Sequence, residues 1–222
     1  MDEDRLLDLY YNQIRFKNSA INVALLTTAS CNFGCSYCYE GDLTYGKKHM
    51  SDETADHAIS WLQARAKENR ASSVNVLFHG GEPLLNIPVI EKVGREMTGF
   101  CRENGMKFVA NMFSNGYLLD RETAERVKAV GVTAAKVTID GPEDVHNSLR
   151  FLKGGGKTYR TIIKNLLEIK DILTIDLGVN YNKDTAHRIP EFLDELIKIG
   201  LGPGAIRKVE CQPIMPGGGS GK

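Results

Sequence analysis

The segment SCNFGCSYCYE, residues 30–40, decides what this chain can bind and how it folds. The segment contains three of the five cysteines of the chain, Cys31, Cys35 and Cys38, which are separated by three and then two residues. Soft thiolates on a tightly turning loop are typical ligands of iron–sulfur clusters. Three thiolates leave a four-iron cluster one ligand short, and Cys101 and Cys211 are distant in sequence. The segment therefore predicts a [4Fe-4S] cluster with one open iron.

Two other uses of clustered cysteines fit this segment less well. Structural zinc takes four Cys or His ligands in paired spacings, and only His49 follows nearby. A disulfide framework is typical of small secreted domains, whereas this chain has 222 residues and an odd number of cysteines. Its first residues are also charged where a signal peptide needs an apolar centre. We therefore expect a cytoplasmic, reducing environment.

The composition allows a full hydrophobic core and indicates no strong attraction to polyanions. The chain is 42% hydrophobic and 25% charged, and 28 basic residues balance 28 acidic ones. A neutral chain has no net field that steers nucleic acid, so nucleic acid is disfavoured as the main partner. No apolar run approaches the roughly 20 residues of a membrane helix. A single main domain with no membrane partner is expected.

The rest of the chain alternates between strand patterns and helix patterns. Such alternation predicts an α/β fold with parallel strands and right-handed crossovers, either a wound sheet or a barrel. The pattern over residues 4–16 also predicts an amphipathic helix that lies on the domain. The expected strands are 21–26, 74–78, 108–113, 132–139, 172–180 and 206–214. The expected helices are 4–16, 52–67, 89–102, 121–129, 159–170 and 190–199.

Cysteines in the pattern Cys-x-x-x-Cys-x-aromatic-Cys after a hydrophobic strand resemble the signature of the radical S-adenosylmethionine (SAM) enzymes. Tyr37 occupies the aromatic position. In that family the amino and carboxylate groups of SAM chelate the open iron, and the reduced cluster cleaves SAM to methionine and a 5'-deoxyadenosyl radical that abstracts hydrogen from the substrate. The resemblance implies a partial (β/α)6 TIM-like barrel of parallel strands. It also implies [4Fe-4S] and SAM as cofactors and an electron donor such as flavodoxin or ferredoxin.

Ligands in such folds bind at the carboxyl ends of the strands, so the residues that follow each strand are informative. The second strand ends in His-Gly-Gly-Glu-Pro, residues 79–83. Paired glycines let the backbone approach a ligand closely, and a carboxylate suits an ammonium partner. This turn resembles the GGEP motif of the family. The match implies that Gly80, Gly81 and Glu82 bind the amino group of SAM.

The later strand ends resemble the subgroup that contains sulfatase maturases and peptide-modifying, SPASM-type enzymes. The third ends in Ser114-Asn115-Gly, with Ser for the usual Thr, and the fourth in Thr138-Ile-Asp-Gly-Pro. His-Asn and then Arg150 follow, with Asn147 for the usual Asp. The resemblance implies that Thr138 contacts the ribose and Arg150 the SAM carboxylate. The full set implied near SAM is Tyr37, Tyr39, Gly80, Gly81, Glu82, Ser114, Asn115, Thr138, Arg150 and Asn180.

The predicted organisation is a helical extension over 1–19, a radical SAM core over 20–215 and a Gly-rich tail over 216–222, which stops before a C-terminal auxiliary-cluster region. The subgroup favours an oxidoreductase that abstracts hydrogen from a peptide or protein side chain, so a peptide or protein is the expected substrate. One alternative is small-molecule cofactor biosynthesis on the same core. Another is a catalytically silent iron–sulfur module. The sequence does not indicate a catalytic side chain.

Overall fold

The computed structural model describes residues 2–15, 19–38 and 48–214. Its six strands form one sheet in the order β1-β2-β3-β4-β5-β6, and every neighbouring pair is parallel. The strands are β1 (Ala20–Thr28), β2 (Ser73–Gly80), β3 (Lys107–Ser114), β4 (Val132–Thr138), β5 (Thr174–Tyr181) and β6 (Ile206–Pro213). The helices are α1 (Glu3–Arg15), α2 (Asp52–Glu68), η1 (Pro83–Asn86), α3 (Ile87–Glu103), α4 (Arg121–Ala129), α5 (Glu143–Leu149), α6 (Tyr159–Ile169), η2 (Ala186–Arg188) and α7 (Ile189–Lys198).

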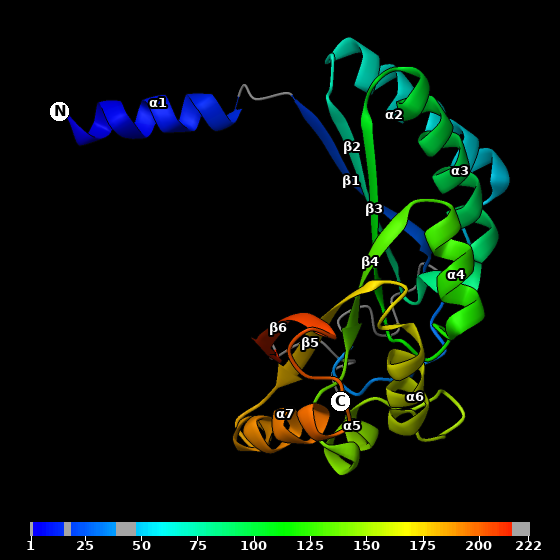
Figure 1. Cartoon of the computed structure of the whole chain (residues 1–222), viewed down its shortest axis with the longest axis vertical. Coiled ribbons are helices and arrows are strands. Elements are labelled where there is room, and N and C mark those ends of the chain that lie inside the picture. Colours follow the sequence, from blue (N-terminus) through cyan, green and yellow to red (C-terminus); the bar gives the residue numbers. More distant parts are fainter. Residues whose placement is uncertain (1, 16–18, 39–47, 215–222) are drawn as a thin grey trace.

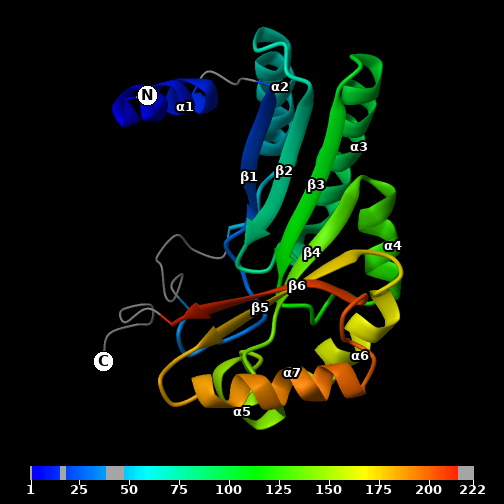
Figure 2. The same ribbon diagram turned by 60° about the vertical axis from the view of Figure 1, so that its left-hand side comes forward.

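The sheet is an open, partial barrel of the TIM type. The alternation of patterns predicted parallel strands but left a wound sheet and a barrel open, and the resemblance implied the barrel. Helices α2, α3 and α4 lie against one face of β1–β4 (Figure 1). Strands β5 and β6 turn across the lower ends of the other strands (Figure 2). Because β1 and β6 are the two edges of the sheet, the barrel is not closed. The face opposite the helices is the inner face of the barrel.

The helix at the N-terminus forms, but it does not lie on the domain as expected. Figure 1 shows α1 apart from the sheet. Its apolar side chains Leu6, Leu7 and Leu9 are 46%, 68% and 55% exposed. An amphipathic pattern predicts a helix with an apolar stripe, but it does not specify which surface covers that stripe. The expectation that α1 packs against the domain was wrong for this structure.

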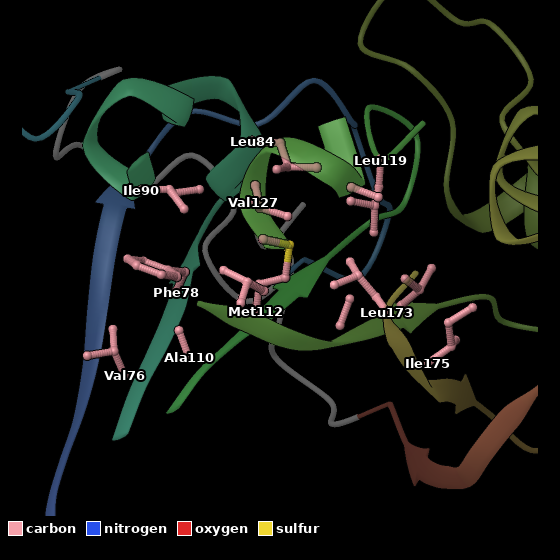
Figure 3. Close-up of a cluster of buried hydrophobic side chains, with 14 of the residues drawn as sticks. Val76, Phe78, Leu84, Ile90, Ala110, Met112, Leu119, Val127, Leu173 and Ile175 are labelled. Carbon is pink, nitrogen blue, oxygen red and sulfur yellow. The ribbon is translucent and has the colours of Figure 1, made fainter. Parts of the chain in front are cut away.

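The hydrophobic core lies between the sheet and its helices (Figure 3). In β2 the side chains alternate, so that Val74, Val76 and Phe78 are buried on the helical side, with exposures of 0%, 2% and 0%. Asn75 and His79 have the opposite orientation and lie on the inner face. The core therefore holds the strands on the face that the helices cover, and the inner face is available for polar groups.

Candidate functional site

A cavity of about 480 Å³ opens at the carboxyl ends of the strands, on the inner face. Residues from the segment after β1 and from the ends of β2 to β6 line it. Of the residues predicted from the sequence, it brings together Cys31, Cys35, Cys38, Tyr37, Gly80, Gly81, Ser114, Asn115, Thr138, Arg150 and Asn180. Sequence reasoning missed His79, Phe113, Lys136, Glu210 and Gln212, which also line the cavity. Tyr39 lies outside the described residues.

The cysteine segment is held in place by backbone pairing with residues 149–153. The N–H of Gly34 donates to the Phe151 carbonyl at 2.8 Å, and the N–H of Ser36 donates to the Leu149 carbonyl at 3.0 Å. Phe33, only 3% exposed, contacts Tyr117 edge-to-face with ring centroids 5.9 Å apart. This buried anchor leaves the neighbouring thiols facing the cavity.

The three thiols on the cavity match the donors of a four-iron cluster, which takes each thiolate on a different iron. Burial raises the pKa of Cys31 to about 11, although a hydrogen bond from the Phe33 N–H opposes this rise. A thiol in this setting becomes a thiolate when a metal binds it.

The paired glycines are required by the backbone of the cysteine segment. Gly80 has φ +146°, and a Cβ there would lie 2.2 Å from the Thr28 carbonyl oxygen. A Cβ on Gly81 would lie 2.5 Å from the Ser30 carbonyl oxygen. The N–H of Gly81 donates to the Thr28 carbonyl at 3.0 Å, and the N–H of Glu82 donates to the Ser30 carbonyl at 2.9 Å. The turn after β2 therefore fixes the start of the cysteine segment while its glycines also face the cavity.

Glu82 lies behind the cavity wall and is hydrogen-bonded to other protein groups. Its side chain is fully buried, and its carboxylate accepts hydrogen bonds from the hydroxyl of Ser114 at 2.9 Å and from the N–H groups of Asn115 and Leu84 at 2.7 Å and 3.1 Å. Burial raises the pKa of Glu82 to about 7, although these three donors oppose the rise. In this arrangement the carboxylate joins the end of β2 to the end of β3. Binding of an amino group by Glu82 stays a prediction.

Tyr37 joins the cysteine segment to the ends of β4 and β5. Its hydroxyl donates to the Asp140 carboxylate and accepts from Arg150 Nη1 at 2.7 Å and from Asn180 Nδ2 at 3.0 Å. The other Asp140 oxygen accepts the backbone N–H of Asn180 at 2.9 Å. Burial raises the pKa of Asp140, whereas the nearby Arg150 guanidinium lowers it. The sequence pattern marked Tyr37 for its aromatic ring, but the hydroxyl makes these contacts.

One donor of Arg150 has no hydrogen-bond partner among the residues that the structure describes. Its Nε is the buried side-chain nitrogen that lacks a hydrogen-bond acceptor within the described part of the chain. The guanidinium lies over the Phe33 ring, 5.8 Å from its centroid, and forms part of the cavity lining. Buried donors in folded proteins almost always have an acceptor. A ligand carboxylate in the cavity would satisfy this donor.

A second chain of hydrogen bonds fixes the backbone of Arg150, and sequence reasoning did not find it. The N–H of Asp140 donates to Nδ1 of the buried His146 at 3.2 Å, so the imidazole proton is on Nε2, 3.0 Å from the Thr158 hydroxyl. Thr158 in turn donates to the Arg150 carbonyl at 2.5 Å. Burial lowers the pKa of His146 to about 3, so the ring stays neutral. His146 lies within the short helix α5, six residues after Asp140, and this spacing after the Asp-Gly-Pro turn was the available signal.

The departure at Asn147 does not remove the contact that its side chain makes. Its Oδ1 accepts the N–H groups of Thr158 and Tyr159 at 2.9 Å and 3.1 Å, which are free donors at the start of α6. Aspartate at this position would offer the same acceptor. The Asn115 amide, which also follows a strand end, donates to Asn32 Oδ1 at 2.7 Å. These polar side chains therefore order the loops around the cavity.

Comparison with known proteins agrees with this geometry. The model of the Radical SAM superfamily matches residues 25–196. The chain belongs to the radical SAM superfamily. Members of this superfamily use a [4Fe-4S] cluster and SAM. The position of the cysteine segment after β1 and the six-stranded open barrel are therefore those of the superfamily core.

The relatives of this radical SAM protein have different named activities. The chain is 28% identical over 172 residues to Fe-coproporphyrin III synthase of Methanosarcina barkeri, covering 76% of this chain and 39% of that protein. It is 26% identical over 180 residues to the sporulation killing factor maturation protein SkfB of Bacillus subtilis, covering 81% and 40%. The solved structure of anSMEcpe with bound AdoMet and a peptide shares the fold, with a TM-score of 0.72 and 18% identity over 88% of this chain and 52% of that one. This chain thus spans about half or less of each of these proteins.

No helix in the described part of the chain has the length and apolar character that crossing a membrane requires.

Proposed function

We propose that this radical SAM protein cleaves SAM reductively and abstracts hydrogen from a peptide or protein side chain. The observation that carries the proposal is that Cys31, Cys35, Cys38 and Arg150 line one cavity, and that the Nε of Arg150 has no acceptor in the described part of the chain. Three thiolates with an open iron and a buried cation beside them suit a ligand that has both an amino group and a carboxylate. SAM is such a ligand.

The residues of the cavity divide the work of binding. Cys31, Cys35 and Cys38 would hold the cluster, which when bound supplies the electron for cleavage of SAM. Arg150 would bind the SAM carboxylate, since its buried Nε has no acceptor within residues 2–15, 19–38 and 48–214. Thr138 and Asn180, at adjacent strand ends, would contact the ribose and the nucleoside. Tyr37 would keep Arg150 and Asn180 in position through its hydroxyl.

Ser114 and Asn115 would keep the remaining wall of the cavity in place. The Ser114 hydroxyl binds buried Glu82, and the Asn115 amide binds Asn32 inside the cysteine segment. Gly80 and Gly81 would let the backbone approach the amino group of SAM. An electron donor such as flavodoxin or ferredoxin is the expected partner. The arrangement identifies no side chain that exchanges hydrogen with the substrate.

Small-molecule cofactor biosynthesis is a second candidate because of the named relatives. Fe-coproporphyrin III synthase and an AdoMet-dependent heme synthase match at 28% and 24% identity. The sporulation killing factor maturation protein SkfB matches at 26%, and the cyclopropyl synthase TigE matches at 24%. These identities are too similar to favour one named activity over another. A peptide substrate receives additional support from the Ser-Asn-Gly and Asp-Gly-Pro motifs after β3 and β4.

The proposal is tested by incubating anaerobically reconstituted protein with SAM and a strong reductant and measuring 5'-deoxyadenosine. Formation of 5'-deoxyadenosine is expected, and the Cys35→Ala variant should form none. A brown, cluster-containing protein that binds SAM but never cleaves it would instead support the catalytically silent module. Protein that holds zinc and no chromophore would contradict the cluster assignment.

A further inference from the structure

Five charged side chains gather on the inner face of β4, β5 and β6. Parallel pairing places Lys136 beside Asp176, and Asp176 beside Lys208. Arg207 donates to both Asp176 oxygens at 2.8 Å and 2.6 Å, and Lys208 lies 3.7 Å from the same carboxylate. Glu210 pairs with both Lys136 and Lys208. We call Lys136, Asp176, Arg207, Lys208 and Glu210 the inner charge cluster.

The inner charge cluster extends from the cofactor cavity along the barrel. Lys136 and Glu210 line the cavity that holds the three cysteines. Lys136 also lines a second hollow on the same face, together with Asp176, Arg207 and Lys208. The residues that β1, β2 and β3 contribute to this hollow are neutral, including Asn22, Asn75 and Asn111. A molecule lying in the barrel next to the cofactor would therefore meet charge on one side only.

The inner charge cluster has an excess of one positive charge, because three cations face two carboxylates. The side chains of Arg207 and Lys208 are 56% and 49% exposed, whereas that of Asp176 is 9% exposed. Arg207 and Lys208 are thus more accessible than the carboxylate that they share, whereas Lys136 and Glu210 are 16% and 34% exposed. The Lys136 ammonium is also held 5.3 Å from the centroid of the Phe113 ring. One further carboxylate would balance the charge and accept these donors.

An ordinary solvated surface is the competing interpretation, since exposed ion pairs have little effect on stability. It does not explain why the charges occupy only β4 to β6 or why two of them reach the cofactor cavity. We propose that the inner charge cluster is a substrate subsite that binds a carboxylate. This inference rests on the proposed function, because it assumes that the substrate lies in the barrel beside SAM. An acidic peptide and a carboxylated tetrapyrrole are the two sources of this carboxylate that the experiment distinguishes.

The experiment measures equilibrium binding to anaerobically reconstituted protein with SAM present. One arm titrates coproporphyrin III and its tetramethyl ester by absorbance. The other titrates a labelled short peptide with adjacent glutamates, and its glutamine counterpart, by fluorescence anisotropy. In one arm the carboxylate form should bind at least about tenfold more tightly than its neutral form, as expected when a charged hydrogen bond is lost. The arm that shows this difference identifies the source of the carboxylate.

Variants then locate the binding site. Lys136→Met and Lys208→Met should each weaken binding of the carboxylate form by about tenfold and leave the neutral form unchanged. Lys164→Met is the matched control, because Lys164 forms a 3.7 Å ion pair with Glu168 on α6, outside the cavities, and it should change neither. If circular dichroism shows that Lys136→Met does not fold, the subsite is tested by Lys208→Met, whose side chain is more exposed, and by the comparison of charged and neutral ligands.

Equal binding of charged and neutral ligands in both arms would overturn the subsite, as would equal losses in Lys164→Met. Formation of 5'-deoxyadenosine by the wild-type protein separates this failure from failure of the proposed function. Wild-type protein that cleaves SAM but shows no carboxylate preference would disprove the subsite alone. Wild-type protein that cannot cleave SAM would disprove the proposed function, whichever ligand binds.

Discussion

Replacing Arg150 by methionine should produce two losses that a second substitution can separate. The Arg150 side chain is 11% exposed and its Nη1 lies 3.9 Å from a fully buried Asp140 oxygen. Removing one partner of a buried ion pair typically costs about 3–5 kcal/mol of folding stability. Because burial raises the pKa of Asp140 and Arg150 lowers it, the variant should lose more stability at pH 8 than at pH 5, where Asp140 is closer to protonation.

The second loss concerns the ligand. If Arg150 binds the SAM carboxylate, its removal should weaken SAM binding by roughly tenfold to hundredfold, the equivalent of one or two charged hydrogen bonds. Adding Asp140→Asn removes the uncompensated carboxylate, so the double variant should recover most of the stability. It should not recover SAM affinity, because the donor itself is still missing. Urea unfolding measures the first effect, and calorimetry on reconstituted protein measures the second.

The double variant is the decisive sample. Recovery of SAM affinity together with stability would mean that Arg150 acts only by holding Asp140 and Tyr37 in place. Unchanged affinity in the single variant would mean that the carboxylate binds elsewhere. Either result would refute the interpretation of the unpartnered Nε. The iron content of each sample serves as the control, since the three cysteines are not altered.

Three further predictions follow from the site. Alanine at any of the three cysteines of the 30–40 segment should abolish the cluster absorbance of reconstituted protein, whereas Cys101→Ala and Cys211→Ala should retain it. The pKa of the buried Glu82 carboxyl is about 7 in the folded protein, against an ordinary value of 4.5, so unfolding releases a proton between these pH values. From pH 4.5 to 7 the metal-free wild-type protein should therefore lose about 3 kcal/mol more unfolding free energy than Glu82→Gln. Parallel pH profiles of the two proteins in urea unfolding would contradict this. Thr158→Val should lower the unfolding free energy by about 1–3 kcal/mol and weaken SAM binding, because the Arg150 carbonyl and the His146 Nε2–H each lose a partner. Thr158→Ser keeps the hydroxyl and should retain both stability and SAM binding. Equal effects of the two substitutions would indicate a packing role.

The order of strands and helices could be predicted because each element has its own local pattern. Buried strands such as β2 alternate between apolar and polar residues, and the helices between them show the helical spacing of apolar residues. Helix α5 was not predicted, although Pro142 precedes it and acidic residues fill its first turn. Its seven residues are too few for the periodicity of a helix to show.

The candidate site could be predicted only at the level of strand ends. Parallel pairing brings those ends to one edge of the sheet, so motifs far apart in sequence had to meet. The direction of a side chain was not predictable in the same way. The Glu82 carboxylate points toward the end of β3, where Ser114 and Asn115 donate hydrogen bonds to it. This direction depends on how β2 and β3 are aligned. The inner charge cluster likewise requires the register of β4, β5 and β6, which no local pattern specifies.

Tyr37 shows how the cofactor residues depend on one another. A phenylalanine at this position would satisfy the aromatic slot of the cysteine signature. It would not give Arg150 and Asn180 an acceptor, and it would leave Asp140 without the phenol donor. The phenol belongs to the segment that supplies the thiols, whereas Asp140 and Arg150 follow β4 and Asn180 lies near the end of β5. Any shift of the cysteine segment therefore also moves the acceptor of Arg150. The geometry of the thiols and the direction of the guanidinium are therefore set by the same contacts, so that ordering one half of the site orders the other.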